Sequence, residues 1–286
     1  MSAREGAALP GAAARDGSGL DAAVGLLTGR RLAIVTGAGI STDSGIPDYR
    51  GEGAPVRTPM TFQEFLSGPD HRRRYWAGSQ RGWRRFAGSE PNAGHYAVAR
   101  LEAAGVAGGV ITQNVDGLHR RAGSSRVVEL HGTADRVRCL DCGRVYPRGD
   151  IAGRIAEANP WFDAAEPALL RPDGDAEVGD VSRFRVPDCS VCGGILKPDV
   201  VFFGELVPQR VFAEAASLLA ASDALLIAGS SLAVNSAVRL LGRAVQRGLP
   251  VVIVNRGATK GDDRATIKLD AGTSETLSAL AERLAG

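Results

Sequence analysis

The sequence predicts an α/β fold built around a doubly wound parallel β-sheet. Five short apolar runs bounded by turn residues have the pattern of buried strands, and helical patterns separate or follow several of them. Strands that alternate with helices are typical of a parallel sheet. A chain of 286 residues is long enough to add a small second domain to one large core.

The expected elements follow one another along the chain. Strands are expected at 31–36, 108–112, 126–130, 224–228 and 250–254. Helices are expected at 92–105, 210–221, 235–248 and 274–285. Asn92 is suited to cap the first of these helices, and Gly105 is suited to end it.

Two segments do not fit this alternation. The first, at 51–90, combines many Arg and aromatic residues without strand runs, which favours a helical insertion, and the second, at 136–197, contains all four cysteines and few apolar residues. The predicted organisation is a disordered N-terminal tail at 1–25, a sheet domain at 26–55, 91–135 and 198–286, and a small domain made from 56–90 and 136–197.

Composition argues against several classes of function. The formal net charge of +2 gives no general case for binding nucleic acid or an anionic membrane surface, and no apolar run approaches the roughly 20 residues that span a bilayer. The first 25 residues lack the apolar stretch of a secretory signal, and they carry more acidic residues than a mitochondrial presequence. A cytoplasmic location is therefore expected. Abundant Arg, Ala and Gly with few lysines favour a bacterial source.

Residues suited to ligand binding follow each expected strand. The runs GAGIS, QNVDG, HG, GSS and NRG come after the five strands in turn. Ligands of open α/β sheets bind in the crevice outside the carboxyl ends of the strands, so these residues are expected at one edge of the sheet. A single turn can carry Gly or Asn for backbone reasons alone, but five such turns in succession favour a binding site.

The run GAGISTDSGIPDYR, at 37–50, begins like a dinucleotide-binding loop and then departs from it. Gly37 and Gly39 supply the first two glycines of G-x-G-x-x-G, whereas Thr42 stands where the third is expected. Backbone N–H groups at a helix N-terminus suffice to hold a pyrophosphate. The acid, phenol and guanidinium that end this run therefore indicate a further chemical role for the loop.

The four cysteines have the spacing of a structural zinc site. Cys139 and Cys142, then Cys189 and Cys192, form two C-x2-C pairs, each followed by Gly as in a zinc knuckle. Four thiolates close the tetrahedron of one zinc ion, which is typical of a structural site. The 46 residues between the pairs are expected to form an extended, partly irregular excursion. A disulfide framework is disfavoured in a cytosolic chain, and a redox role for one pair leaves the other unexplained.

Together these motifs resemble the sirtuins, a family of NAD-dependent protein deacylases. The run at 37–50 is followed in order by TQNVDGLH, ELHG, the paired C-x2-C motifs and KPDVVFFGE, so the resemblance covers about residues 26–286. The strings RYW, GW, EPNAGH and CGGILKPDVVFFGE look most like the class II branch. The resemblance implies a Rossmann-like NAD-binding domain, a small zinc-binding plus helical domain, and a cleft between them.

The resemblance also implies which residues contact NAD. The glycine-rich start of the first loop would cradle phosphates, with Asp48 at the nicotinamide carboxamide, Tyr49 shielding the reacting carbon and Arg50 near phosphate. Amide and carboxylate side chains suit hydroxyl and amide groups of the cofactor. The expected contacts are Gly37, Ala38, Gly39, Ser41, Asp48, Tyr49, Arg50, Gln113, Asn114, Asp116, Gly229, Ser230, Ser231, Asn255, Arg256, Gly257 and Thr273.

His131 is the expected general base. An imidazole with a pKa near 6.5 can accept a proton at neutral pH, and the ELHG context favours this role over that of a histidine that merely ends a strand. Asn114 and Asp116 are expected to complete the catalytic group. The remaining histidines are expected to have structural or surface roles: His71, His95 and His119.

The reaction implied by the resemblance consumes NAD and an acyl-lysine protein or peptide. The acyl oxygen attacks C1′ of the nicotinamide ribose as nicotinamide leaves. His131 then deprotonates the ribose so that its 2′-oxygen attacks the imidate carbon, and water releases lysine and 2′-O-acyl-ADP-ribose. Val201, Phe202, Phe203 and Gly204 are expected to add the substrate peptide as a strand.

The preferred acyl group stays open. Relatives that remove succinyl or malonyl groups carry a Tyr-x-x-Arg pair, whereas here Tyr75 is followed three residues later by Gly78. This departure argues against an acidic acyl group, although Arg81 or Arg84 could take the place of the missing arginine.

Three other functions compete with the deacylase. A protein mono-ADP-ribosyltransferase would use the same NAD site and cannot be separated from a deacylase by sequence. A non-catalytic NAD sensor or zinc scaffold has no reason to keep a base beside the ribose. A nucleic-acid-binding zinc module is disfavoured because the segment between the cysteine pairs is not markedly basic. The sequence does not indicate an oligomeric state.

Overall fold

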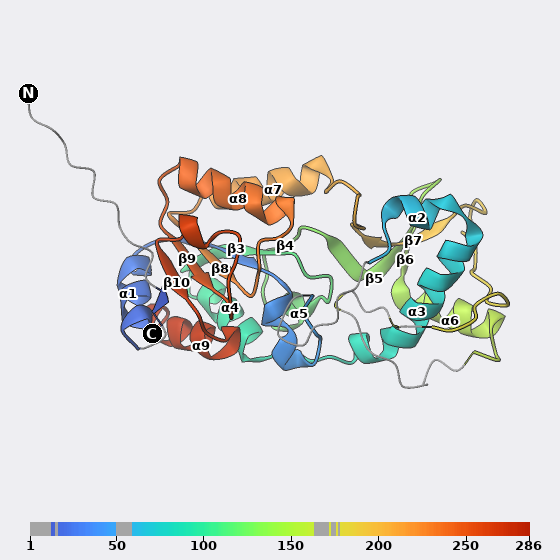
Figure 1. Ribbon diagram of the computed structural model, residues 1–286, viewed down its shortest axis with the longest axis horizontal. Helices are drawn as coiled ribbons and strands as arrows, with labels where there is room; N and C mark the ends of the chain where they lie inside the picture. Colours follow the sequence, from blue (N-terminus) through green and yellow to red (C-terminus); the bar gives the residue numbers. More distant parts are fainter. Residues whose placement is uncertain (1–12, 15–16, 50–58, 163–171, 173–175, 177) are drawn as a thin grey trace, which may run out of the picture.

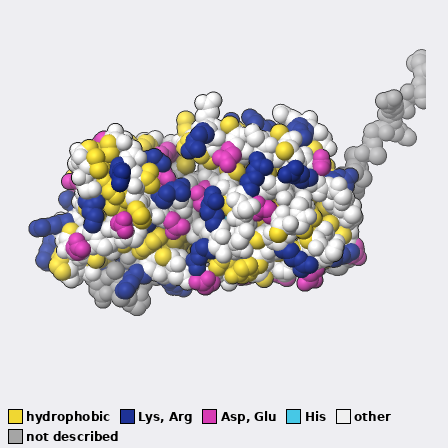
Figure 2. Space-filling model, turned by 180° about the vertical axis from the view of Figure 1, so that it is seen from behind, with side chains coloured by type: hydrophobic (Ala, Val, Ile, Leu, Met, Phe, Trp, Pro, Cys, Tyr) yellow, Lys and Arg dark blue, Asp and Glu magenta, His cyan; other side chains and the backbone are white. Residues whose placement is uncertain are grey.

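The computed structural model describes residues 13–14, 17–49, 59–162, 172, 176 and 178–286. A sheet covered by helices on both faces forms one end of the molecule, and a smaller unit of three strands and three labelled helices forms the other end (Figure 1). Lys and Arg side chains are interspersed with Asp and Glu over the face shown in Figure 2. Among the described residues, no helix is both long and apolar enough to cross a membrane.

The larger sheet has seven parallel strands in the order β1-β10-β9-β8-β2-β3-β4. They are β1 (Ala13–Ala14), β2 (Leu32–Thr36), β3 (Ala107–Thr112), β4 (Val127–Glu129), β8 (Ala224–Ala228), β9 (Val251–Val254) and β10 (Ile267–Leu269). The predicted parallel α/β sheet is confirmed, and each of the five expected strands ends within one residue of its predicted limits. The strands β1 and β10 were not predicted.

Helices cover both faces of this sheet because its central strands are apolar on both sides. In β2, Leu32 and Ile34 belong to one core and Ala33 and Val35 to the other. Three helices pack in the first core: α1 (Gly17–Leu27), α4 (Ala93–Ala103) and α9 (Thr273–Leu284). Two pack in the second: α7 (Gln209–Ala220) and α8 (Asn235–Gln246).

The beginning of the first helix corrects the predicted N-terminal boundary. The tail was expected to be disordered through residue 25, but α1 already begins at Gly17. Ala23, Val24 and Leu27 are buried in the core that α1 shares with α9, so their apolar contacts hold the helix in place. The remainder of the predicted tail, apart from β1, lies outside the described residues.

The smaller unit combines an antiparallel sheet with helices. Its strands are ordered β6-β5-β7 and comprise β5 (Gly132–Cys139), β6 (Val145–Pro147) and β7 (Leu196–Val200). Its helices are α2 (Phe62–Ser67), α3 (Pro69–Ala87) and α6 (Arg148–Ala158). Phe65, Trp76 and Ile151 join all three helices in one core. The helices at 62–87 match the expected helical insertion, whereas α6 was not predicted in the segment between the cysteine pairs.

Candidate functional site

A cleft of about 1630 Å³ brings together the turns at the carboxyl ends of the large sheet's strands. It is lined by every expected site residue for cofactor, base and substrate that the structure describes. These are Gly37, Ala38, Gly39, Ser41, Asp48, Tyr49, Gln113, Asn114, Asp116, His131, Val201, Phe202, Phe203, Gly204, Gly229, Ser230, Ser231, Asn255, Arg256, Gly257 and Thr273. Arg50 lies outside the described residues.

The first glycines of the loop after β2 are required by packing against the loop after β8. The N–H of Gly39 donates to the carbonyl of Gly229, which follows β8, at 2.9 Å. A Cβ on Gly37 would lie 2.8 Å from the Gly229 oxygen, and one on Gly39 would lie 2.9 Å from the Gly229 Cα. The two loops therefore meet backbone against backbone and form one wall of the cleft.

Gly229→Ala is expected to destabilise the protein by about 2 kcal/mol or more, because Gly229 has φ +66° and its Cβ would lie 2.4 Å from the Ile40 nitrogen. Chemical denaturation measures this loss. Gly248 is the matched control, since it has φ +67° but open space around the added Cβ. Gly248→Ala should therefore carry the backbone strain alone. Equal losses in the two variants would show that contact with the first loop is unimportant.

The side chains of Ser41, Asn114 and Asp116 form a hydrogen-bonded network beneath that wall. The hydroxyl of Ser41 donates to Asp116 Oδ2 at 2.7 Å, and Asn114 Nδ2 donates to Ser41 Oγ at 3.0 Å and to the Gly37 carbonyl at 3.1 Å. Burial raises the pKa of Asp116, opposed by hydrogen bonds from Leu118 N and Ser41. Ser41, one of the expected NAD contacts, lines the cleft, and its buried hydroxyl also holds Asn114 and Asp116 in position.

Two buried histidines lie behind this network. His119 Nε2 is 2.8 Å from Thr36 Oγ1, His95 Nε2 is 3.4 Å from Ser41 Oγ, and the two imidazole rings are 4.9 Å apart. Burial lowers the pKa of His95 to about 4, and burial followed by repulsion from His95 lowers the pKa of His119. Both rings are therefore neutral at pH 7. Their positions in the core agree with the structural roles expected for them.

His131 lies in the turn between β4 of the large sheet and β5 of the smaller unit. Its Nδ1 is 2.9 Å from the carbonyl oxygen of Gln113, and its Nε2 is 2.9 Å from the hydroxyl of Ser236. Burial lowers the pKa of His131, and the Gln113 carbonyl opposes this effect. The imidazole is thus held neutral at the cleft wall, as a general base at neutral pH requires. Ser236 was not predicted, since its sequence context indicates only the beginning of a helix.

The segment expected to bind the substrate, at 201–204, forms a turn after β7 and lies next to His131. The Val201 N–H donates to the His131 carbonyl at 2.8 Å, and the Phe203 carbonyl accepts from Phe62 N at 2.9 Å. The Phe203 ring is 42% exposed and meets the Tyr49 ring edge-on at 6.2 Å. Tyr49 and Phe203, from two loops far apart in sequence, thus face each other across the cleft.

The turn at 255–257, which carries three of the expected NAD contacts, is held by a lysine that sequence analysis missed. Lys268 Nζ donates to the carbonyl oxygens of Asn255, at 2.6 Å, and Gly257, at 3.0 Å. Thr273, another expected NAD contact, also lines the cleft, and its hydroxyl donates to the Gly39 carbonyl at 3.2 Å. The Lys268 contact was not visible in the sequence because β10, which carries Lys268, was not predicted.

Comparison with known proteins identifies the family. The model of the "Sir2 family" matches residues 37–236. NAD-dependent protein deacetylase 1 of Mycobacterium avium is 52% identical over 91% of this chain and 94% of its own length. The chain belongs to the Sir2 family. NAD-dependent protein deacetylase 1 of Streptomyces coelicolor, also a relative, is 52% identical over 88% of this chain and 85% of its own length.

Solved Sir2 structures have the same fold as this Sir2-family chain. A Sir2 structure described with p53 peptide and NAD+ superimposes with a TM-score of 0.74 at 32% identity, and it covers 92% of this chain and 97% of its own. A Sir2 structure bound to acetylated peptide gives a TM-score of 0.72 at 31% identity, with the same shares of the two chains covered. The expected sirtuin resemblance and Rossmann-like fold are confirmed.

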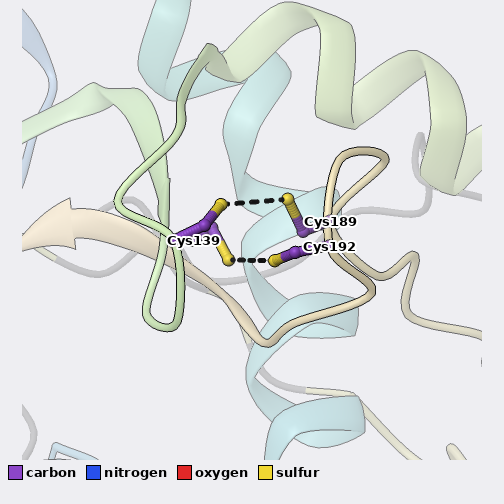
Figure 3. A group of neighbouring side chains, drawn as sticks. Cys139, Cys189 and Cys192 are labelled. Carbon is purple, nitrogen blue, oxygen red and sulfur yellow. Dashed lines mark hydrogen bonds between the residues drawn. The ribbon is translucent and has the colours of Figure 1, made fainter.

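The four cysteines of this Sir2-family chain converge in the smaller unit, as predicted for a metal site (Figure 3). Their sulfur atoms lie within 4.8 Å of one another, with 3.5 Å between Cys139 and Cys192 and 3.7 Å between Cys142 and Cys189. Four thiolates about 2.3 Å from one zinc ion would lie about 3.8 Å apart, so the set fits tetrahedral zinc. The Tyr146 hydroxyl, 3.1 Å from Cys189 Sγ, lowers the pKa of that thiol.

Proposed function

We propose that this Sir2-family protein is an NAD-dependent protein-lysine deacetylase in which His131 is the general base. The observation that carries this proposal is a neutral imidazole held between two hydrogen bonds on the wall of a dinucleotide-type cleft. Because this imidazole is already unprotonated at neutral pH, it can accept the proton of a sugar hydroxyl without first losing a proton of its own. The names of the bacterial relatives, which describe NAD-dependent protein deacetylases, support the same activity.

The residues that line the cleft fit NAD. The glycines of the first loop would let phosphates approach its backbone closely, while the carbonyl oxygen of Asn114 and the carboxylate of Asp116 offer acceptors for ribose hydroxyls and a carboxamide. Asp48 and Tyr49, at the far end of the same loop, would close over the nicotinamide half. NAD supplies an electrophilic sugar carbon when its nicotinamide leaves. The protein contributes binding, orientation and a proton acceptor.

The proposed substrate is an acetylated lysine on an extended peptide. Residues 201–204 lie beside His131 and carry the partly exposed Phe203 ring at the mouth of the cleft. An extended peptide can form backbone hydrogen bonds with residues 201–204. Its acetyl-lysine side chain would then enter the cleft between this turn and the loop that carries Tyr49. The Sir2 structures described with acetylated and p53 peptides support a peptide substrate. A cytoplasmic location is proposed because the clustered free thiols suit a reducing compartment.

The test of this function is a panel of acyl-lysine peptides incubated with NAD, with nicotinamide and deacylated peptide measured together. Equal amounts of the two products, with acetyl-lysine among the accepted substrates, are expected. Nicotinamide release without an acylated peptide, accompanied by ADP-ribose on protein, would instead favour the mono-ADP-ribosyltransferase.

Asn114→Ala is expected to lower nicotinamide exchange and deacetylation together, by roughly tenfold or more. The substitution removes the two hydrogen bonds that tie Gly37 and Ser41 to this position, each contributing about 1 kcal/mol. Exchange of labelled nicotinamide into NAD reports the first half of the reaction. Exchange at the wild-type rate would remove Asn114 from the nicotinamide end of the cleft.

A further inference from the structure

The contact between Ser236 and His131 joins two elements that are far apart in the sequence. Ser236 is the second residue of α8, only 5% of its surface is exposed, and its hydroxyl lies 2.9 Å from His131 Nε2. The N-terminal end of α8 has no side-chain cap, and the residue at the cap position is Val234. The Ser236 hydroxyl is therefore directed at the imidazole and does not cap its own helix.

The direction of both hydrogen bonds at His131 follows from the partners. The Gln113 carbonyl can only accept, so Nδ1 carries the proton of the neutral ring. Nε2 then has a lone pair, and the Ser236 hydroxyl donates to it. The ring is fixed at both nitrogens, which sets its tautomer and its rotation at the same time.

Building on the function proposed above, we propose that Ser236 is a positioning residue that holds the His131 imidazole with Nε2 unprotonated and aligned in the cleft. A substrate hydroxyl that reaches Nε2 takes the place of the serine hydroxyl as hydrogen-bond donor. The substrate O–H bond then breaks, its proton forms an N–H bond at Nε2, and the imidazole becomes imidazolium. Because the ring is already oriented for this transfer, little reorientation is needed when the proton moves.

The electrostatic surroundings of His131 allow this contact to be tested by titration. The charged side chains that line the same cleft are Asp43, Asp48, Asp116, Glu205, Arg239 and Arg256. The pKa of His131 is nevertheless lowered mainly by burial, with the Gln113 carbonyl as the opposing influence. Removing a donor to Nε2 takes away a bond that stabilises the neutral ring, so the pKa of His131 should rise.

The first experiment is an NMR pH titration of the histidine rings in the full-length, NAD-free protein. His131→Gln assigns the signal among the four histidines of the chain. Ser236→Ala should raise the pKa of His131 by about 0.5 to 1 unit, the size of one net hydrogen bond, and Ser236→Thr should keep it near the wild-type value. An unchanged pKa in Ser236→Ala would overturn the proposal.

Ser222→Ala is the matched control for loss of a buried hydroxyl. Ser222 is 2% exposed, and its hydroxyl donates to the Leu218 carbonyl, away from the cleft. This variant should leave the titration of His131 unchanged. A shift equal to that of Ser236→Ala would mean that the effect comes from general loosening of the fold, and the positioning role would be rejected.

The second experiment separates the two halves of the reaction. Ser236→Ala should lower kcat for deacetylation about 5- to 10-fold, leave KM and nicotinamide exchange near wild type, and move the acid limb of the pH profile upward. Ser236→Thr should restore the rate. An equal loss of exchange and deacetylation would overturn the positioning role. If the wild-type protein deacetylated no peptide, the proposed function would fail, whereas the titration would still test the contact itself.

Discussion

His131→Ala is expected to lower deacetylation by about 100-fold or more while much of the nicotinamide exchange remains. In the proposed mechanism His131 acts on a hydroxyl after the nicotinamide has left, so the first half of the reaction should not need it. The imidazole is held by Gln113 and Ser236, and neither bond forms part of the glycine loop that would bind phosphate. Affinity for NAD and for acetyl-peptide should therefore stay near wild type.

The measurement compares initial rates of exchange and of peptide deacetylation on the same preparations. His71→Ala is the matched control, because His71 is exposed on α3 and contacts the hydroxyl of Ser67, away from the cleft. It should retain both rates. Equal loss of exchange and deacetylation in His131→Ala would assign His131 to NAD binding or folding, and continued deacetylation would exclude it from the mechanism.

The pH dependence of deacetylation follows from the same imidazole. Burial lowers the pKa of His131 below the ordinary 6.5, so the unprotonated form dominates at pH 7. The rate should therefore rise with pH below 6.5 and reach a plateau near neutrality. In Ser236→Ala the same rise should occur at higher pH, which connects this profile with the proposed positioning role.

The sheet and its ligand-binding edge could be predicted because both depend on local pattern. The apolar run at 224–228, for example, is buried along its whole length, and the strand predicted from its sequence has the same limits in the structure. The turns after them meet at one edge whatever the details of their side chains, since the strands are parallel. This geometry is why the expected site residues in the five turns after β2, β3, β4, β8 and β9 line one cleft, although these turns are far apart in the sequence.

Side-chain partners across the fold could not be predicted in the same way. Ser236 and His131 are 105 positions apart, and their contact depends on how α8 lies against the turn between β4 and β5. Ser41 and Thr273 were predicted as NAD contacts, but the sequence did not indicate that their hydroxyls donate to the Asp116 carboxylate and the Gly39 carbonyl. A motif indicates where a residue lies and leaves open which neighbour takes its hydrogen bond.

Short elements were missed for a related reason. The three residues of β10 carry Lys268 between two apolar positions, a pattern too brief to distinguish from a loop. Helix α6 has few strongly apolar residues, and only Ile151 and Ile155 supply its large buried aliphatic contacts in the core. In both cases burial against neighbouring elements stabilises a segment whose own sequence signal is weak.

Removal of the zinc ion, or Cys139→Ser, is expected to unfold the smaller unit and abolish deacetylation. Cys139 ends β5 and Cys189 lies 50 positions later, and both are buried in the core that contains Phe65 and Trp76. Zinc bound by four thiolates supplies folding free energy on the order of 10 kcal/mol in small domains, comparable to the whole stability of many proteins. The effect on activity is indirect, since β5 and β7 of this unit flank the turns that carry His131 and 201–204.

Metal analysis should find one zinc ion per chain in the wild-type protein, and thermal unfolding with and without a chelator should show the loss of stability. Val191→Ser is the matched control: Val191 lies between Cys189 and Cys192, is 68% exposed and is not a ligand. Its stability should stay within about 0.5 kcal/mol of wild type. Four thiolates leave no coordination position for water, so the zinc ion should take no direct part in the reaction. Zinc added back after chelation should therefore restore folding and deacetylation together. A Cys139→Ser variant that kept its zinc, its thermal midpoint and its activity would show that fewer than four cysteines hold the metal.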